Sequence, residues 1–191
     1  MTLLIAGIFI FIAGHLVTTR RELRARLIAR FGEGPYKGLY SLVAFIGLAL
    51  IAFGFSRYRA AGYIDVWDPP RWTRHIAITL MWFAFVALAA AYAPHGKIAG
   101  LLRHPMLNAV KIWALAHLIA NGDLGSIILF TTILAYAGYD RFAVKWRGDI
   151  GAPRVAGFTT GDGIAIGAGS AAWVAMIYLH PYLIGVPVIG M

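Results

Sequence analysis

The chain has 191 residues, of which 60% are apolar and 13% are charged, and a soluble core of this size could not bury so much apolar surface. It has no cysteine, which excludes disulfides, thiolate-ligated zinc, iron–sulfur clusters and thiol catalysis within the chain. The net charge of +9 is spread over short loops between apolar runs, a pattern typical of membrane proteins rather than of nucleic-acid-binding ones.

The first apolar stretch has no basic residue before it. Met1 and Thr2 lead directly into the run from Leu3 to Val17, and basic residues begin only at Arg20. A signal peptide has the opposite order, with basic residues first and a small-residue cleavage site afterwards. We therefore expect an uncleaved span over 2–19 with its N-terminus on the non-cytoplasmic side.

Five further stretches approach the roughly 20 apolar residues that cross a bilayer. They cover residues 38–56, 75–93, 106–120, 124–139 and 164–184. With the first span they predict an all-α fold, a polytopic membrane bundle of about six helices forming one transmembrane domain over 1–191. The fourth and fifth stretches are short and are separated only by Asn121, Gly122 and Asp123. This turn-type sequence favours an antiparallel hairpin. The alternative is one re-entrant element whose turn lines a cavity.

Two other segments have a predicted structural role. Residues 63–72 contain two prolines and two tryptophans, which favours a non-helical segment in the membrane interface, with a substrate lid as the alternative. Glycines 163, 167 and 169 precede Ser170 inside the last span. No strand comes before them, so they predict a helix-packing face rather than a phosphate-binding loop.

The basic residues of the loops give an orientation. Twelve lie in the loops after the first, third and fifth spans, and four lie after the second and fourth. Lys and Arg concentrate on the cytoplasmic side of membrane proteins. We therefore expect a multi-pass protein of a bacterial inner membrane with both termini on the non-cytoplasmic side.

Histidines inside the spans are the candidate functional residues, because an ionisable side chain in the bilayer needs a reason to be there. His15 lies late in the first span and His117 late in the fourth. At 1.5 Å per residue we expect both imidazoles within roughly 5 Å of the midplane. Small residues beside them, Gly14 and Ala114 with Ala116, would leave space for a flat macrocycle, so the pair predicts bis-histidine haem ligation. A hydrogen bond to a neighbouring helix is the alternative for each.

The fourth span carries a second polar face. His104, Asn108 and Lys111 share a stripe nearly opposite His117. Lys111 is interpreted as snorkelling toward the surface, with a buried functional cation as the alternative. A retinal-type Schiff-base lysine is a further alternative, but it should have an intramembrane carboxylate as its counter-ion, and no predicted span contains Asp or Glu. Trp113 and Asn121 lie one turn either side of His117 and are further candidates for tuning a pocket. The remaining histidines, His75, His95 and His180, lie near span ends and are expected to be interfacial.

Several short strings in this order resemble the NnrU family of bacterial membrane proteins, named for a member associated with denitrification. They are Gly14-His15-Leu16, Arg103-His104-Pro105-Met106, Trp113-Ala114-Leu115-Ala116-His117-Leu118, Asn121-Gly122-Asp123 and Tyr139-Asp140-Arg141. The resemblance covers nearly the whole chain.

That family is similar to the plant 15-cis-zeta-carotene isomerase, a haem b membrane enzyme with two axial histidines. Carried over by motif, these ligands fall on His15 and His117. The isomerase has a cysteine three residues before its second histidine, implicated in redox-dependent ligand switching, and this chain has Ala114 there. Isomerase activity is therefore not simply inherited.

The resemblance implies two functions. The first is a haem b protein acting on a hydrophobic substrate in the bilayer, with isomerase-like chemistry on a cis double bond. The second is a non-catalytic accessory role in denitrification, through assembly, electron supply or regulation of nitrite or nitric oxide reductase. A purely structural or transport role has only the polar stripe of the fourth span in its favour.

Overall fold

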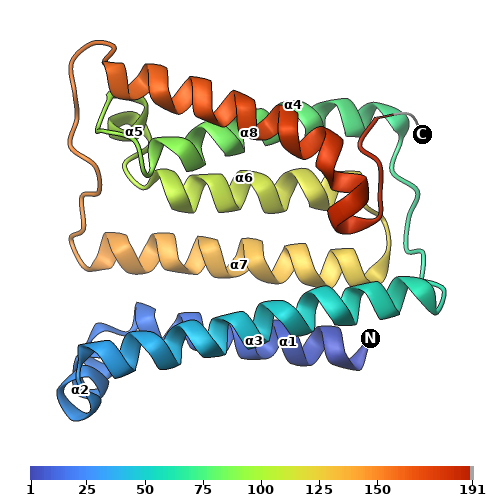
Figure 1. Cartoon of the computed structure of the whole chain (residues 1–191), viewed down its shortest axis with the longest axis horizontal. Coiled ribbons are helices and arrows are strands. Elements are labelled where there is room, and N and C mark those ends of the chain that lie inside the picture. Colours follow the sequence, from blue (N-terminus) through green and yellow to red (C-terminus); the bar gives the residue numbers. More distant parts are fainter. Residues whose placement is uncertain (190–191) are drawn as a thin grey trace. The chain divides into compact units, whose positions relative to one another are not determined.

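The computed structural model describes residues 1–189, and these residues form eight helices and no sheet (Figure 1). The prediction of an all-α fold is confirmed. The helices are α1 (Thr2–Thr19), α2 (Arg21–Phe31), α3 (Glu33–Ala60), α4 (Arg71–Ala90), α5 (Lys97–Leu102), α6 (Pro105–Ala120), α7 (Leu124–Trp146) and α8 (Thr160–Ile184).

Five of these helices, α1, α3, α4, α7 and α8, are long and apolar enough to cross a membrane. The remaining predicted span, α6, is apolar but has only 16 residues. In the five long helices only 11% to 33% of the most apolar window is buried inside the protein. Most of their apolar side chains therefore face outward, as expected for helices surrounded by lipid.

Several helices extend beyond the predicted spans. α3 begins at Glu33 rather than residue 38, and α7 continues to Trp146 rather than residue 139. A helix does not end where apolarity ends, because polar side chains are accommodated in the interface. In the first turn of α3, Glu33 and Lys37 form an i,i+4 ion pair at 2.8 Å. The helices α2 and α5 were not predicted, since the expected elements came from hydropathy alone.

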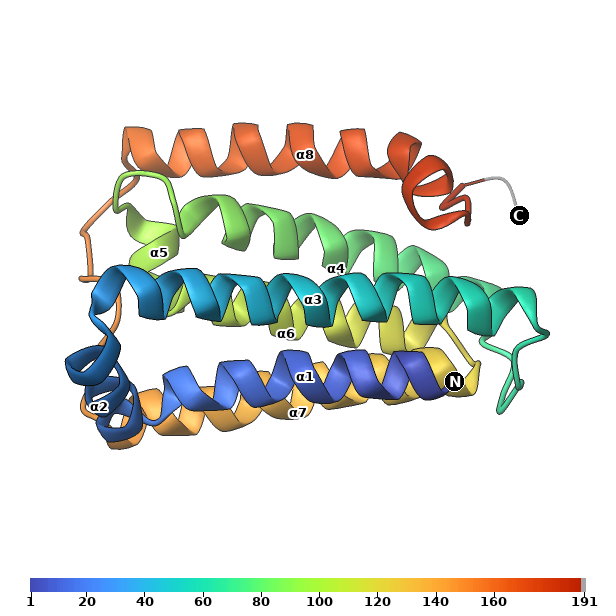
Figure 2. The ribbon, with the colours of Figure 1, turned by 60° about the horizontal axis from the view of Figure 1, so that its bottom comes forward.

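The chain divides into two compact units. Unit 1 comprises residues 1–68 and 122–136, and unit 2 comprises residues 69–121 together with the described residues from 137 onward. In unit 1, α1 packs antiparallel against α3 (Figures 1 and 2). In unit 2, α4 packs against both α6 and α8 and lies between them (Figure 2).

Glycines allow α1 and α3 to approach closely. A Cβ atom on Gly7 would lie 2.6 Å from the Ile51 backbone nitrogen, and one on Gly47 would lie 2.8 Å from the Phe11 nitrogen. Gly54 meets the backbone of Leu4 in the same way. Each helix thus presents hydrogen atoms where any other residue would present a side chain, which is a common device for packing membrane helices.

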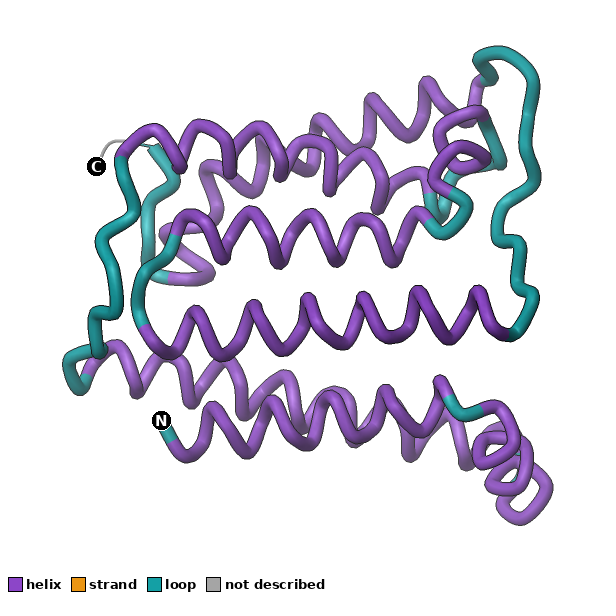
Figure 3. Tube along the Cα trace, turned by 180° about the vertical axis from the view of Figure 1, so that it is seen from behind, coloured by secondary structure: helices purple, strands orange, loops and turns teal. Residues whose placement is uncertain are grey.

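The segment before α4 is non-helical, as predicted, from residue 62 to residue 70 (Figure 3). Tyr58, which is 5% exposed, holds it in place: its hydroxyl accepts the backbone N–H groups of Ile64 (2.9 Å) and Gly125 (3.2 Å). An isolated antiparallel bridge also joins Asp65 to Asp123. These contacts lie within unit 1.

The turn sequence after α6 interrupts the helix. Asn121 has an extended backbone, with φ −128° and ψ 131°, and the next helix begins at Leu124. Residues 105–146 are thus two helices and not one continuous element.

In unit 2 only part of the predicted glycine face packs against another helix. Gly169 lies against the backbone of Val86 on α4, whereas nothing among the described residues lies within 4 Å of a Cβ placed on Gly163 or Gly167. Ser170, the next residue of the predicted face, also contacts α4, because the Trp82 indole donates to its hydroxyl (2.9 Å). The predicted packing face is therefore confirmed at Gly169 and Ser170 and not at Gly163 and Gly167.

Asp162 joins α8 to α5. Its side chain is 1% exposed and accepts the backbone N–H groups of Lys97 (2.9 Å), Ile98 (2.7 Å) and Thr159 (2.8 Å). It therefore caps the N-terminus of α5 and completes the capping box of α8 with Thr159. This anchor fixes the chain just before α6.

Candidate functional site: the histidine environments

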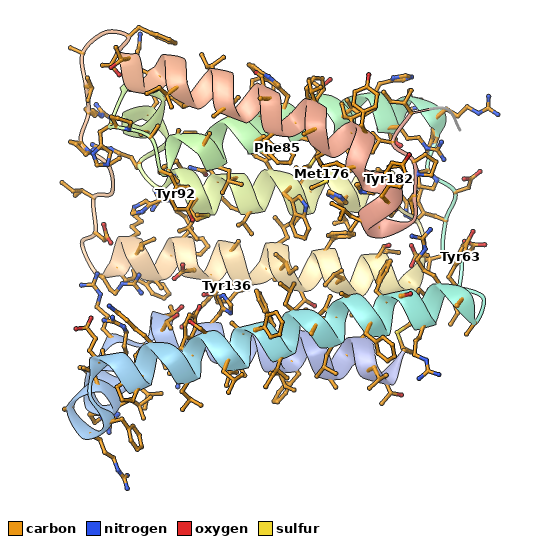
Figure 4. All side chains as sticks on the ribbon, in the orientation of Figure 1. Tyr63, Phe85, Tyr92, Tyr136, Met176 and Tyr182 are labelled. Atoms are coloured by element: carbon orange, nitrogen blue, oxygen red, sulfur yellow. The ribbon has the colours of Figure 1, made fainter. Side chains whose placement is uncertain are left out.

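His15 lies in unit 1 among aromatic rings. Its ring centroid is 4.1 Å from that of Phe11, 5.6 Å from that of Tyr40 and 5.8 Å from that of Tyr136, which is labelled in Figure 4. The His15 Nδ1 atom donates to the Phe11 carbonyl oxygen at 2.7 Å. A carbonyl can only accept, so the proton is on Nδ1 and the ring lone pair is on Nε2.

His117 lies in unit 2 in a similar arrangement. Its Nδ1 atom donates to the Trp113 carbonyl oxygen at 2.9 Å, and its ring centroid is 5.1 Å from that of Trp113. The Asn121 side-chain amide donates to the His117 carbonyl oxygen at 2.7 Å. The predicted residues Trp113 and Asn121 therefore contact His117 directly.

The two environments follow one pattern along the chain. Each histidine has an aromatic residue four positions before it, whose carbonyl orients the ring. Each has a polar residue four positions after it, Thr19 or Asn121, whose side chain donates to the histidine carbonyl. A backbone carbonyl on one ring nitrogen, leaving the lone pair on the other, is typical of histidines that bind a metal.

The two histidines are not central in their helices. His15 lies four residues before the end of α1, and His117 lies three residues before the end of α6. At 1.5 Å per residue each is about 7 Å from the middle of its own helix. Their equal depth relative to the bilayer midplane stays a prediction, because the middle of a helix and the midplane of the bilayer need not coincide.

The small residues beside the histidines are closely packed. Ala114 and Ala116 are 0% exposed, and a Cβ on Gly14 would lie 3.3 Å from Val43. That they make room for a macrocycle beside the rings stays a prediction.

The other residues of the predicted stripe lie at the opposite end of α6. His104 precedes the helix, and its Nε2 donates to the Asp149 carbonyl at 3.3 Å. The Asn108 amide donates to the Leu102 carbonyl at 2.9 Å. Lys111 is half-buried, as a snorkelling lysine would be. His104 is 13 residues from His117, about 20 Å along a helix, so the structure does not bring these residues to His117.

The residue before His104 has a strained backbone. Arg103 is the only described residue other than glycine with a positive φ, 62°. Two hydrogen bonds hold it to the segment after α7: its carbonyl accepts from the Ala152 N–H (2.7 Å), and its Nη1 donates to the Ala152 carbonyl (3.0 Å). Beside it is a shallow cavity of about 300 Å³ within unit 2, lined among others by His95, Arg103 and His104.

His180 was expected to be interfacial, but it lies beside His117. The two ring centroids are 6.5 Å apart with 28° between the ring planes. Hydropathy placed His180 near a span end and gave no sign of this neighbour, since the contact arises between α6 and α8. Hydropathy likewise gave no sign that Tyr40 and Tyr136 lie beside His15.

The histidines suit haem better than a metal ion that needs three or more protein ligands. Within residues 1–189 no group of three or more His, Cys, Asp or Glu side chains converges to hold a metal. Haem iron takes four nitrogens from the macrocycle and needs one or two protein ligands. Single histidines with a lone pair on Nε2 are therefore sufficient.

Comparison with known proteins gave one match. The model of the family described as NnrU protein matches residues 3–188, nearly the whole chain. No curated protein matches this chain. No solved structure matches it.

Proposed function

Because this chain belongs to the NnrU protein family, we propose that it is a membrane haem b protein whose iron is bound by His15 and His117. The shared environment of the two rings carries the proposal. In both, Nδ1 donates to the carbonyl four residues earlier, at 2.7 Å and 2.9 Å, so that Nε2 is the nitrogen with the lone pair.

Bound haem would supply an iron centre able to change oxidation state and to accept a ligand. The chain's own residues orient the two imidazoles through the Phe11 and Trp113 carbonyls and place the Phe11 and Trp113 rings beside them. A substrate for such a site is a hydrophobic molecule from the bilayer, such as a polyene with a cis double bond. Since position 114 is alanine, a thiolate at that position could not take part in ligand exchange.

An accessory role in denitrification is the second candidate. Both rings are held at Nδ1 by short hydrogen bonds, and firmly held axial ligands suit an electron carrier. In that case the partners are the enzymes that reduce nitrite or nitric oxide, and the location is the bacterial inner membrane.

One spectrum separates these functions. The full-length protein, purified in detergent from cells supplied with haem precursor, is reduced with dithionite and measured with and without carbon monoxide. Carbon monoxide binding indicates an exchangeable ligand and favours catalysis. An unchanged six-coordinate spectrum favours electron transfer, and loss of nitrite or nitric oxide turnover on deletion of the gene would support that role.

The ligands are tested by substitution. We expect His117→Ala and His15→Ala each to convert a low-spin spectrum to a high-spin one or to reduce the haem bound per protein at least about tenfold. His75→Ala, an exposed histidine in α4, is the matched control and should leave the spectrum unchanged. Wild-type protein without a Soret band would reject the proposal.

A further inference from the structure

Two histidines from different helices lie next to each other at one end of unit 2. His117 is three residues before the end of α6, and His180 is four residues before the end of α8. Their ring centroids are 6.5 Å apart, and both side chains are half-buried. Figure 4 labels Met176 and Tyr182, which flank His180 on the same part of α8.

The backbone around His180 positions its ring. Pro181 lies inside α8, where it has no N–H to donate, and the helix bends near this end (Figure 1). Gly185 then ends the helix in the left-handed conformation, with φ 80°. The following residue, Val186, thereby comes back to His180, and its carbonyl oxygen accepts from Nδ1 at 2.6 Å.

Both rings therefore donate through the same nitrogen. His117 donates from Nδ1 to the Trp113 carbonyl and His180 from Nδ1 to the Val186 carbonyl. A neutral imidazole that donates from Nδ1 has its lone pair on Nε2, the atom through which it binds a metal.

The separation of the rings suits a shared metal. With metal–nitrogen bonds of 2.0–2.1 Å, two imidazoles on one metal have ring centroids roughly 5 Å apart in tetrahedral geometry and roughly 6.4 Å apart in linear geometry. The observed 6.5 Å is close to the linear value.

We propose that His117 and His180 form a two-imidazole site that binds one transition-metal centre through the Nε2 atoms of both rings. Imidazole nitrogens suit copper, zinc, iron and nickel, whereas magnesium and calcium need oxygen ligands. The site lies in unit 2 alone and does not require His15. The metal is a free ion, with copper the tightest-binding divalent ion, and it competes with haem because both would use the Nε2 atom of His117.

Copper alone tests the pair. Full-length protein purified without haem is titrated with copper(II) sulfate in detergent, and pulsed EPR counts the imidazoles bound to the copper. We expect one tight copper ion with two imidazoles in the wild-type protein. His117→Ala and His180→Ala should each leave one imidazole and raise the Kd at least about tenfold.

Two further variants serve as controls for this test. His180→Asn places an amide N–H near the position of Nδ1, so it can retain the hydrogen bond to the Val186 carbonyl while removing the Nε2 ligand. His75→Ala controls for surface binding. Copper affinity that is unchanged in His180→Ala and His180→Asn overturns the proposal. Affinity lost only in His75→Ala identifies an adventitious ion only and overturns it as well.

A haem-loaded sample separates this site from the proposed haem site. Because haem bound by His15 and His117 would occupy the His117 Nε2 atom, haem-loaded protein should bind copper more weakly than haem-free protein. A His15→Ala variant that remains low-spin and becomes high-spin only when His180→Ala is added would assign His180 to the haem iron and overturn both proposals. Wild-type protein that lacks a Soret band but binds copper through both histidines would reject the proposed function and retain this site.

Discussion

Tyr58 is the residue that ties the non-helical segment before α4 to the start of α7. Its hydroxyl accepts two backbone N–H groups, and its ring lies so close to Gly125 that a Cβ atom there would overlap it. We expect Gly125→Ala to displace the ring and to destabilise unit 1 by about 1–3 kcal/mol, the usual effect of overpacking. Hydrogen exchange at the Ile64 and Gly125 amides measures the loss of both hydrogen bonds.

Gly138 on the same helix provides the control. Nothing among the described residues lies within 4 Å of a Cβ placed there. Gly138→Ala should leave exchange at Ile64 unchanged and stabilise the helix by about 0.5–1 kcal/mol. Equal exchange at Ile64 in the Gly125→Ala and wild-type proteins would show that Tyr58 does not hold the segment.

At the level of residues, the sequence predicted the candidate ligands but not all of the side chains that surround them. His15 and His117 stand out because a histidine inside an apolar span is unusual. The aromatic residues one turn before them are also visible in the sequence, since a helix places positions i and i−4 on one face. His180, Tyr40 and Tyr136 join these rings through contacts between helices, which a single sequence does not encode as a pattern.

At the level of elements, the glycines of α1 and α3 follow a regular spacing. Gly7 and Gly14 are seven residues apart on α1, and Gly47 and Gly54 are seven apart on α3. At three of the four, an added Cβ atom would lie under 3 Å from the backbone of the opposite helix. Each interval of two turns thus returns a small residue to the same helix face, where it allows close approach.

Substitution at this interface should separate the helices. A Cβ on Gly54 would strike the backbone of Leu4, which cannot move without moving α1. We expect Gly54→Ala to lower the stability of the α1–α3 pair by about 1–3 kcal/mol, measured by thermal unfolding in detergent. Gly38→Ala, on the same helix with nothing within 4 Å among the described residues, should not lower it. A similar decrease in both variants would assign the effect to α3 itself.

Hydropathy located the six apolar helices and missed α2 and α5, which form for other reasons. α2 is an 11-residue helix with four arginines, and its formation owes nothing to apolarity. α5 has six residues and depends on the Asp162 carboxylate, which lies 64 and 65 residues after the two backbone N–H groups that it caps. The helix ends also differ from the predicted span ends. Capping and interface contacts decide where a helix ends, and lipid thickness does not.

For the whole molecule, the short helix α6 decides the topology. Its 16 residues span about 24 Å, less than the roughly 30 Å of a hydrocarbon core. If α6 did not cross, the four basic residues after α7 would lie outside, and the loops would carry eight basic residues on each side. With α6 crossing, the distribution is twelve to four. The charge bias therefore favours crossing, at a modest cost in local bilayer thinning.

The absence of cysteine makes this topology directly measurable, because each introduced thiol is the only one in the protein. Thr2, Ala29, Ala61 and Ala156 are exposed and lie outside the apolar spans or at their ends. We expect a membrane-impermeant maleimide to label Thr2→Cys and Ala61→Cys in intact cells, and Ala29→Cys and Ala156→Cys only after the membrane is opened. Labelling of Ala156→Cys from outside, with Ala29→Cys protected, would mean that α6 does not cross. His117 would then belong to a re-entrant element, and its imidazole would face the compartment from which α6 enters rather than the opposite side.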